Sequence, residues 1–289
     1  FQKLNICIQQ LGCQMFFDQM DEPWVSVPID GHVENIRVSS KRFGWIVRGK
    51  FKSLFNEGIG EDIIQQAVGA NLGDIYQSGV RRRLFYRSSW NKSRDKILID
   101  SGRADWAVYE IAPDGWQLTY LEENPFKRER GFMAYECEPN TPRATWDNLF
   151  EILPIRNQSH QGLIKLWLAL ALFPETPRPG LIINGPEGSG KTTLAKKIRS
   201  IVDPLSSEKP NRLWNQEENL IVALSGKFIN IFDNVSFMST DASDILCQSI
   251  TGGCFEKRAR YHDAELHSIE LMTTWIITGI SNPAKLPDF

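Results

Sequence analysis

The stretch LIINGPEGSGKTTLAKKIRS, residues 181–200, decides how the second half of the chain folds. A short apolar run over 181–183 is followed by a glycine-rich segment, after which apolar residues recur at helical spacing. This order predicts a β-strand, a loop and an α-helix. The apolar stripe of the predicted helix consists of Leu194, Ala195, Ile198, Ile201 and Val202.

The loop fits the pattern G-x-x-x-x-G-K-[ST], in which each residue type has a role in holding phosphate. Glycine lets successive backbone N–H groups approach an anion, and the N-terminus of the following helix adds positive potential. Lys191 can reach the β- and γ-phosphates, and the Thr192 hydroxyl can bind Mg²⁺. A chance match is the alternative, but the flanking patterns argue against it. The predicted ATP-binding residues are Gly185, Pro186, Glu187, Gly188, Ser189, Gly190, Lys191, Thr192 and Thr193.

Composition describes an ordinary globular chain. With 289 residues, 42% hydrophobic and 24% charged, it can hold two domains with cores. A net charge of -2 and a pI near 6.2 mean that nucleic acid would need a local basic patch. Five cysteines without a C-x-x-C pair predict reduced thiols in a cytoplasmic protein and argue against a zinc site. The longest apolar stretch, residues 163–173, is too short to cross a bilayer, so no membrane association is expected.

A second apolar run, KFINIFDNV at residues 227–235, ends in Asp233. A carboxylate at the end of a buried strand beside a phosphate loop offers Mg²⁺ a hard oxygen ligand, so we expect Asp233 to bind the metal. The alternative is a turn or cap residue. Asn234 follows where many ATPases of this kind carry a second carboxylate that polarises the attacking water. Asp241 and Asp244 could supply that carboxylate or could cap a helix.

A third apolar run, TTWIITGI at residues 273–280, contains Thr278 and is followed closely by Asn282. If this strand lies next to the loop strand, one of these polar side chains lies beside the γ-phosphate. Both qualify as catalytic residues on the sequence alone.

Between these two runs, a double glycine at residues 252–253 opens two strands joined by a polar turn. Such a hairpin can place positive charge in a pore that holds nucleic acid, or it can be a solvated surface hairpin. The residues near its tip that could contact nucleic acid are Lys257, Arg258, Arg260, Tyr261 and His262.

The first half of the chain mixes helices with strands. Alternation around Asp30-Gly31 predicts a hairpin, and helical spacing follows over 43–55 and 61–72. Further strands are expected over 97–100, 106–111 and 116–121. We therefore predict a small α+β domain with an antiparallel sheet over 1–140. A polar joint at 136–143 leads to a domain over 141–289, whose β-α-β-α-β order implies a parallel sheet flanked by helices.

The segment RRRLFYRSSWNKSRDK, residues 81–96, holds seven basic residues and one acid with aromatic residues interleaved. Positive charge and rings suit single-stranded nucleic acid. The alternative is an exposed edge strand that its charges keep soluble.

With these parts in order, the chain resembles the AAA+ helicases of superfamily 3 and the poxvirus-type primase-helicases. It looks closest to helicase-like ATP-binding proteins of bacterial prophages and mobile elements. The resemblance covers residues 159–283 and rests on GPEGSGKT at 185–192, INIFDN at 229–234, LCQSITGGCFEKRARYH at 246–262 and WIITGISN at 275–282.

The resemblance implies a P-loop AAA+ ATPase that forms a ring, such as a homo-hexamer. Such a motor hydrolyses ATP with Mg²⁺ and translocates on or unwinds single-stranded or forked DNA during replication of a phage or mobile element. The hairpin would contact DNA in the central channel, and the N-terminal domain would serve as a collar or docking domain. Two features depart from the pattern: Asn234 replaces the usual acid, and few residues follow Asn282 where such ATPases keep an arginine finger.

Two rival functions stay open. A nucleotide-gated switch or scaffold, for example in phage defence, would bind ATP and DNA without unwinding, and Asn234 favours it. A P-loop kinase for a small molecule would leave the basic hairpin unexplained, and no arginine-rich lid follows the loop helix.

Overall fold

A computed structural model describes residues 2–128, 131–137, 144–206, 209–258 and 266–283, with the backbone alone for 256–258 and 266–268. Over these residues the chain is mixed α/β, with one parallel three-stranded sheet and three antiparallel sheets. None of the helices in this part of the chain is both long and apolar enough to cross a membrane.

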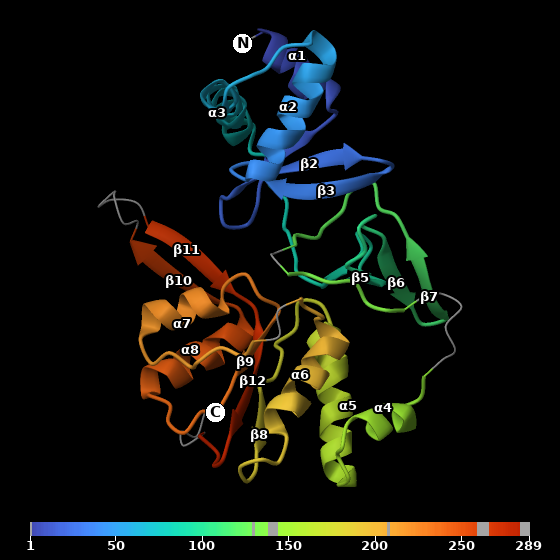
Figure 1. The fold of residues 1–289 in the computed structure, drawn as a ribbon, viewed down its shortest axis with the longest axis vertical. Coiled ribbons are helices and arrows are strands. Elements are labelled where there is room, and N and C mark those ends of the chain that lie inside the picture. Colours follow the sequence, from blue (N-terminus) through green and yellow to red (C-terminus); the bar gives the residue numbers. More distant parts are fainter. Residues whose placement is uncertain (1, 129–130, 138–143, 207–208, 259–265, 284–289) are drawn as a thin grey trace.

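The N-terminal part packs three helices on a three-stranded antiparallel sheet of order β1-β2-β3 (Figure 1). Asp30 and Gly31 connect β2 to β3 with φ values of 46° and 87°, which confirms the predicted hairpin and its two-residue turn. The side chain of Ser40 caps α2 by accepting a hydrogen bond from Phe43 N. The bounds are α1 Gln2–Gln10, β1 Gln14–Phe17, β2 Pro23–Ile29, β3 His32–Arg37, α2 Lys41–Phe55 and α3 Glu61–Ser78.

A second antiparallel sheet follows, of order β4-β5-β6-β7. The pairing of Ala112 with Gly115 leaves Pro113 and Asp114 as the turn between β6 and β7. Two strands are shifted from the expected 106–111 and 116–121. Strand β6 starts later than expected because Trp106 has a φ of 54°, outside the extended region, whereas β7 begins one residue earlier and ends two residues earlier than expected. The bounds are β4 Ser88–Trp90, β5 Ile97–Asp100, β6 Val108–Ala112 and β7 Gly115–Thr119.

The C-terminal part contains the parallel sheet, of order β8-β12-β9. Figure 1 shows α5 and α6 on one face and α7 and α8 on the other. Ile276 packs with the first pair and Ile277 with the second, as alternation along a strand requires. The bounds are α4 Trp146–Ile152, α5 Gln158–Leu172, β8 Leu181–Asn184, α6 Lys191–Val202, α7 Glu217–Leu224, β9 Ile229–Phe232, α8 Thr240–Thr251, β10 Gly253–Arg258, β11 Leu266–Leu271 and β12 Thr274–Gly279.

The predicted parallel sheet is thus confirmed, and the third apolar run is its central strand. All six residues of β12 are buried, which explains why its sequence is continuously apolar apart from threonine. Gly180, just before β8, has no room for a side chain, since a Cβ there would lie 2.1 Å from the Trp275 ring.

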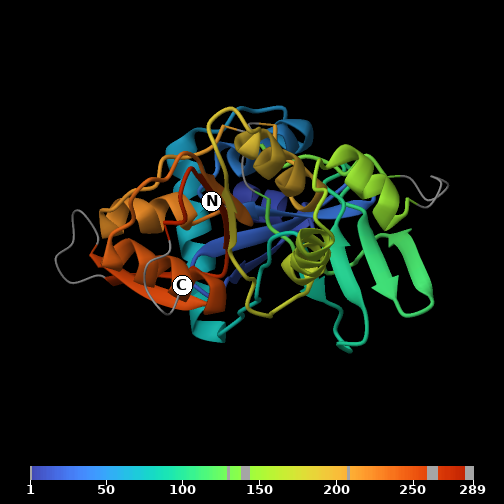
Figure 2. The ribbon, with the colours of Figure 1, turned by 90° about the horizontal axis from the view of Figure 1, so that it is seen from below.

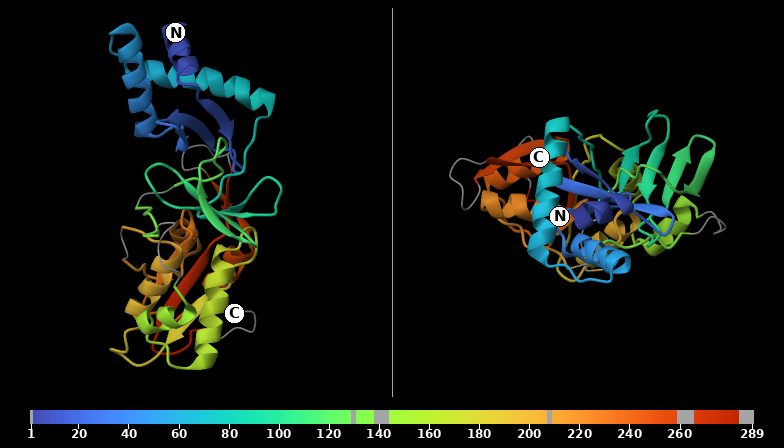
Figure 3. Two further views of the ribbon diagram at one scale, coloured as in Figure 1. Left: turned by 90° about the vertical axis from the view of Figure 1, so that its right-hand side faces the viewer. Right: turned by 90° about the horizontal axis from the view of Figure 1, so that it is seen from above.

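The three parts lie one above the other, with the β4–β7 sheet between the N-terminal helices and the parallel sheet (Figure 3). The β10–β11 hairpin and the β4–β7 sheet project on opposite sides, as Figure 2 also shows. The expected domain joint at 136–143 falls largely on residues 138–143, which lie outside the described residues.

Candidate nucleotide site

The glycine-rich loop connects the end of β8 to the start of α6 at the carboxyl edge of the parallel sheet. Gly188 and Gly190 have φ values of 74° and 79°, a region open to glycine and costly for most other residues. Gly190 is the N-cap of α6, so the free N–H groups of that helix point at the loop. The loop is anchored to the central strand where Gly185 N donates to Gly279 O at 3.3 Å. The backbone therefore has the shape that an anion site needs.

Lys191 is the first residue of α6, and its ammonium group lies over the loop. Its Nζ donates to the carbonyl oxygens of Gly185 at 2.9 Å and Pro186 at 2.7 Å, and it lies 3.4 Å from Ser189 Oγ. These are neutral acceptors on half-buried or exposed groups. A phosphate oxygen would be a stronger, charged acceptor for the same ammonium group.

Thr192 and Asp233 meet although they are far apart in the sequence. The Thr192 hydroxyl, in the first turn of α6, donates to Asp233 Oδ1 at 2.7 Å. Asp233 directly follows β9, so the loop and the second apolar run converge on one point. A hydroxyl and a carboxylate side by side are the hard oxygen donors that suit Mg²⁺, and the residues present therefore fit that ion. Thr193, the next residue in the helix, is exposed.

Thr278 completes this group from the central strand β12. Its hydroxyl donates to the same Asp233 Oδ1, and it accepts a hydrogen bond from Asn234 N at 3.2 Å. The side chain of Asn234 is exposed, and its φ of 55° turns the chain sharply away from β9. Of the two candidates from the third apolar run and the residues after it, Thr278 contacts Asp233, whereas Asn282 lies exposed beyond the end of β12.

The two additional acids considered from the sequence lie on α8. Ser239 is the N-cap of that helix and accepts from Ala242 N, so neither Asp241 nor Asp244 is the cap residue itself. Asp241 lies in the first turn, where a negative charge complements the helix dipole. Both side chains are exposed.

The predicted basic hairpin is present as β10 paired antiparallel with β11. The backbones of Lys257 and Arg258 form the last two residues of β10, with Arg258 opposite Leu266. The other predicted contact residues, Arg260, Tyr261 and His262, lie outside the described residues.

The basic segment 81–96 is heavily ion-paired. Its central strand β4 is short and lies at the edge of its sheet, which favours the edge-strand interpretation. Six of its seven basic residues contact a carboxylate: Arg81–Asp21, Arg83–Glu270, Arg87–Asp203, Lys92–Glu123, Arg94–Glu175 and Lys96–Glu110. The seventh, Arg82, donates to Gln14 Oε1 at 2.5 Å.

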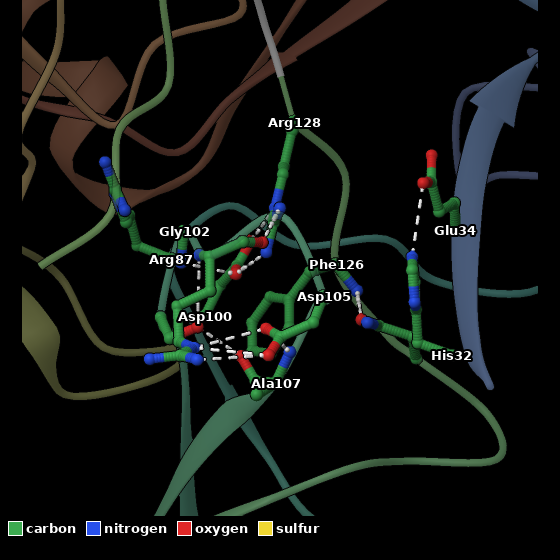
Figure 4. Close-up of polar contacts among 12 residues, drawn as sticks. His32, Glu34, Arg87, Asp100, Gly102, Asp105, Ala107, Phe126 and Arg128 are labelled. Atoms are coloured by element: carbon green, nitrogen blue, oxygen red, sulfur yellow. Dashed lines mark hydrogen bonds and ion pairs between the residues drawn. The ribbon is translucent and has the colours of Figure 1, made fainter. Parts of the chain in front are cut away.

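Sequence patterns do not indicate the buried contacts at the far end of α6. Asp203 directly follows this helix and accepts from Arg87 Nε at 2.8 Å. Nearby, Arg128 forms a bidentate ion pair with Asp100, with Nε–Oδ2 at 2.8 Å and Nη2–Oδ1 at 2.5 Å (Figure 4). No local pattern pairs such residues, because each pair joins segments distant in the chain.

Comparison with known proteins gives one family match. Residues 146–289, just under half of the chain, match the family model described as actinomycete integrative conjugative element replication protein. This match supports a replication-related protein. No curated protein has a significant sequence match to the chain.

Solved structures give weaker similarities. The apo A form of the NrS-1 C-terminal region is similar over 96% of this chain and 55% of that chain, with a TM-score of 0.43 and 14% identity. A second apo structure of the NrS-1 C-terminal region has a TM-score of 0.42, with 13% identity over 96% of this chain and 56% of that one. The chain therefore spans about half the length of these structures.

Proposed function

We propose that the chain is an AAA+-like motor that hydrolyses ATP and translocates on or unwinds DNA during replication of a mobile element. The observation that carries this proposal is the 2.7 Å hydrogen bond from Thr192 to Asp233, next to a glycine loop with the geometry of an anion site. The match of residues 146–289 to a family of replication proteins supports the biological role.

Each residue of the site has a distinct task in this proposal. The backbone N–H groups over 188–192 bind the phosphates, and Lys191 moves from the loop carbonyls to the phosphate oxygens. Thr192 and Asp233 hold Mg²⁺, which supplies charge neutralisation on those oxygens when it is bound. Thr278 senses the γ-phosphate in this proposal, because a change at Asp233 when the phosphate binds would alter the hydrogen bond that Thr278 donates to Asp233.

Single-stranded or forked DNA is the proposed partner, contacted by the hairpin that contains Lys257 and Arg258. The proposed assembly is a homo-hexamer or another ring. The hairpin projects well away from the nucleotide site in Figure 1, so coupling would run along the sheet that joins them. In the sheet order, β12 is the strand that contacts both β8 and β9.

A second candidate is a nucleotide-gated DNA-binding switch that does not unwind. The exposed side chain of Asn234 favours it, because an amide cannot accept the proton of an attacking water. The motor and the switch share the same binding residues and differ in turnover.

ATP turnover by Lys191→Ala tests the proposal. Removing the ammonium group should lower turnover by at least about a hundredfold, because it removes charge stabilisation at the transferred phosphate. Lys197→Ala is the matched control, since Lys197 lies on the same helix, is exposed and donates to Ile152 O at 3.2 Å. Undiminished turnover in Lys191→Ala, with an unchanged melting temperature in both variants, would refute the assignment.

A further inference from the structure

A cleft lies at the edge of the parallel sheet opposite the nucleotide site. Residues 83–86, before β4, and residues 225–228, before β9, line it together with Gln19, Met20 and Arg37 of the N-terminal part. Two adjoining cavities of about 80 and 400 Å³ form it, and both are lined by Tyr86, Lys227 and Phe228. Lys227 and Phe228 directly precede β9, whereas Asp233 directly follows that strand. The cleft and the nucleotide site therefore lie at opposite ends of the same strand.

The cleft has a surplus of positive charge. Its lining includes five cations and three carboxylates, and each carboxylate already has an arginine partner. Those pairs are Glu175–Arg94 at 2.5 Å, Glu270–Arg83 at 2.9 Å and Asp203–Arg87 at 2.8 Å. The cations of the lining are Arg37, Arg83, Lys127, Arg178 and Lys227.

Lys227 and Arg178 have no carboxylate partner among the residues that the structure describes. Arg178 is buried, donates to the carbonyl oxygens of Ala171 and Met272, and lies 4.5 Å from the centre of the Phe228 ring. Burial lowers the pKa of Arg178 to about 10. Burial, and to a lesser degree the charge of Arg199, lowers the pKa of Lys227. A bound anion would offset both effects, because it stabilises the charged form of each side chain.

Aromatic rings line the same cleft beside these cations. Tyr86 is half-buried and packs against the core of the parallel sheet, and Phe132, which pairs with Leu205, lines the larger cavity with it. The Arg87 guanidinium lies 3.4 Å from the centre of the Phe132 ring and Lys127 Nζ lies 5.0 Å from that of Tyr86, so a base would contact the remaining surface of each ring. Rings for bases and cations for phosphates are the combination that binds single-stranded nucleic acid with little sequence preference. The larger cavity, about 400 Å³, lies within the usual range for a bound nucleotide-sized group.

We propose that this cleft binds a segment of single-stranded nucleic acid, with a phosphate beside Lys227 and a base beside Tyr86 or Phe132. This inference rests on the proposed DNA-binding function and adds a contact separate from the β10–β11 hairpin. The hairpin strand β11 lines the smaller cavity through Glu270 and Leu271, so a strand in the cleft would continue towards the hairpin.

Binding of a fluorescein-labelled dT20 oligonucleotide to the full chain, measured by anisotropy over a range of KCl concentrations without nucleotide, tests the proposal. Lys227→Gln should weaken binding about threefold to tenfold and reduce the salt slope by about 0.7, the value for one phosphate contact on a single strand. Lys197→Gln should bind like the unaltered protein. The double variant Lys257→Gln, Arg258→Gln should weaken binding independently.

The results distinguish failure of the cleft proposal from failure of the proposed DNA-binding function. If only the hairpin variant weakens binding of dT20, nucleic-acid binding in the cleft is refuted, whereas DNA binding by the chain is supported. If the unaltered protein hydrolyses ATP but binds no dT20, both the proposed DNA-binding function and the proposed role of the cleft are refuted. Loss of ATP binding in Lys227→Gln with unchanged dT20 binding would also refute the cleft, because the ligand would then be a free nucleotide.

Crosslinking gives a second readout that does not depend on a variant's stability. An oligonucleotide containing 5-bromodeoxyuridine is irradiated with the unaltered protein, and the modified peptides are mapped. Crosslinks at Tyr86, Phe132 or Phe228 would support the cleft. Crosslinks confined to other segments would overturn the proposal that the cleft binds nucleic acid. This result would hold even if Lys227→Gln lowered the melting temperature, because the crosslinked protein is unaltered.

Discussion

Arg87 and Asp203 form a buried ion pair that joins the β4–β7 sheet to the helix of the phosphate loop. The Nε–Oδ1 distance is 2.8 Å, and the two side chains are 0% and 2% exposed. The same guanidinium donates to the carbonyl oxygens of Met133 at 3.0 Å and Pro204 at 2.6 Å, so each of its three nitrogen atoms donates a hydrogen bond. Because Asp203 ends α6, this contact fixes the far end of the helix whose first turn holds Lys191 and Thr192.

Replacing Arg87 by methionine should destabilise the protein strongly. The change removes the closer partner of the buried Asp203 carboxylate and leaves Arg199 Nε 3.9 Å from Oδ2, so we expect a cost of about 3 kcal/mol, the lower end of the range for breaking a buried pair. Urea unfolding measures the free energy. Arg81→Met is the matched control, since Arg81 is exposed and its pair with Asp21 should contribute about 0–1 kcal/mol. A loss below about 1 kcal/mol for Arg87→Met would show that the buried pair does not join the two parts.

Thr192→Val should weaken ATP binding in the presence of Mg²⁺ but not in EDTA. Valine keeps the shape of threonine and removes the hydroxyl that donates to Asp233. We expect a loss of about tenfold in affinity with Mg²⁺, by analogy with other losses around metal sites. Thr192→Ser, which keeps the hydroxyl, should bind normally. Equal effects with and without Mg²⁺ would contradict the metal-ligand role of Thr192.

Asn234→Asp distinguishes the motor from the switch. The backbone N–H of Asn234, and not its side chain, bonds to Thr278, and aspartate tolerates the positive φ at this position. In a motor that already turns over ATP, the variant should change the rate by less than about threefold. A rise of about a hundredfold, the gain that a general base can supply, would show that the chain lacks its base and acts as a switch.

The thiols should differ in their reactivity with iodoacetamide. Burial raises the pKa of Cys13 to about 11, so at pH 8 only about one molecule in a thousand carries the thiolate there. Labelling of Cys13 should be slow and should rise about tenfold per pH unit between pH 7 and 9. Cys254 is exposed and should react first. Rapid labelling of Cys13 at pH 7 would contradict the raised pKa of this half-buried thiol.

Much of the site could be predicted from the sequence because its parts are local. The loop needs glycine at positions 188 and 190 for its positive φ values, and a lysine and threonine must open the helix. The apolar runs predicted the parallel strands and identified Asp233, Thr278 and Asn282 as candidates, but the sequence did not choose between Thr278 and Asn282. The hydrogen bond from Thr278 to Asp233 is known from the structure alone.

The remaining features depend on contacts between distant segments. Arg87 and Asp203 are 116 residues apart, and a basic residue in a segment rich in arginine does not indicate which carboxylate it will meet. Helix α7 was missed because its eight residues are few for a helical period to be recognised. The shifted start of β6 depends on the backbone at Trp106, which pattern alone does not set.

ATP turnover of the purified chain with and without single-stranded DNA, together with its mass in solution bound to a non-hydrolysable ATP analogue, tests whether the chain is a DNA-dependent motor. A motor should show turnover that DNA stimulates and a mass that corresponds to a ring. A monomer that binds ATP and turns it over no faster with DNA would contradict the motor and favour the switch.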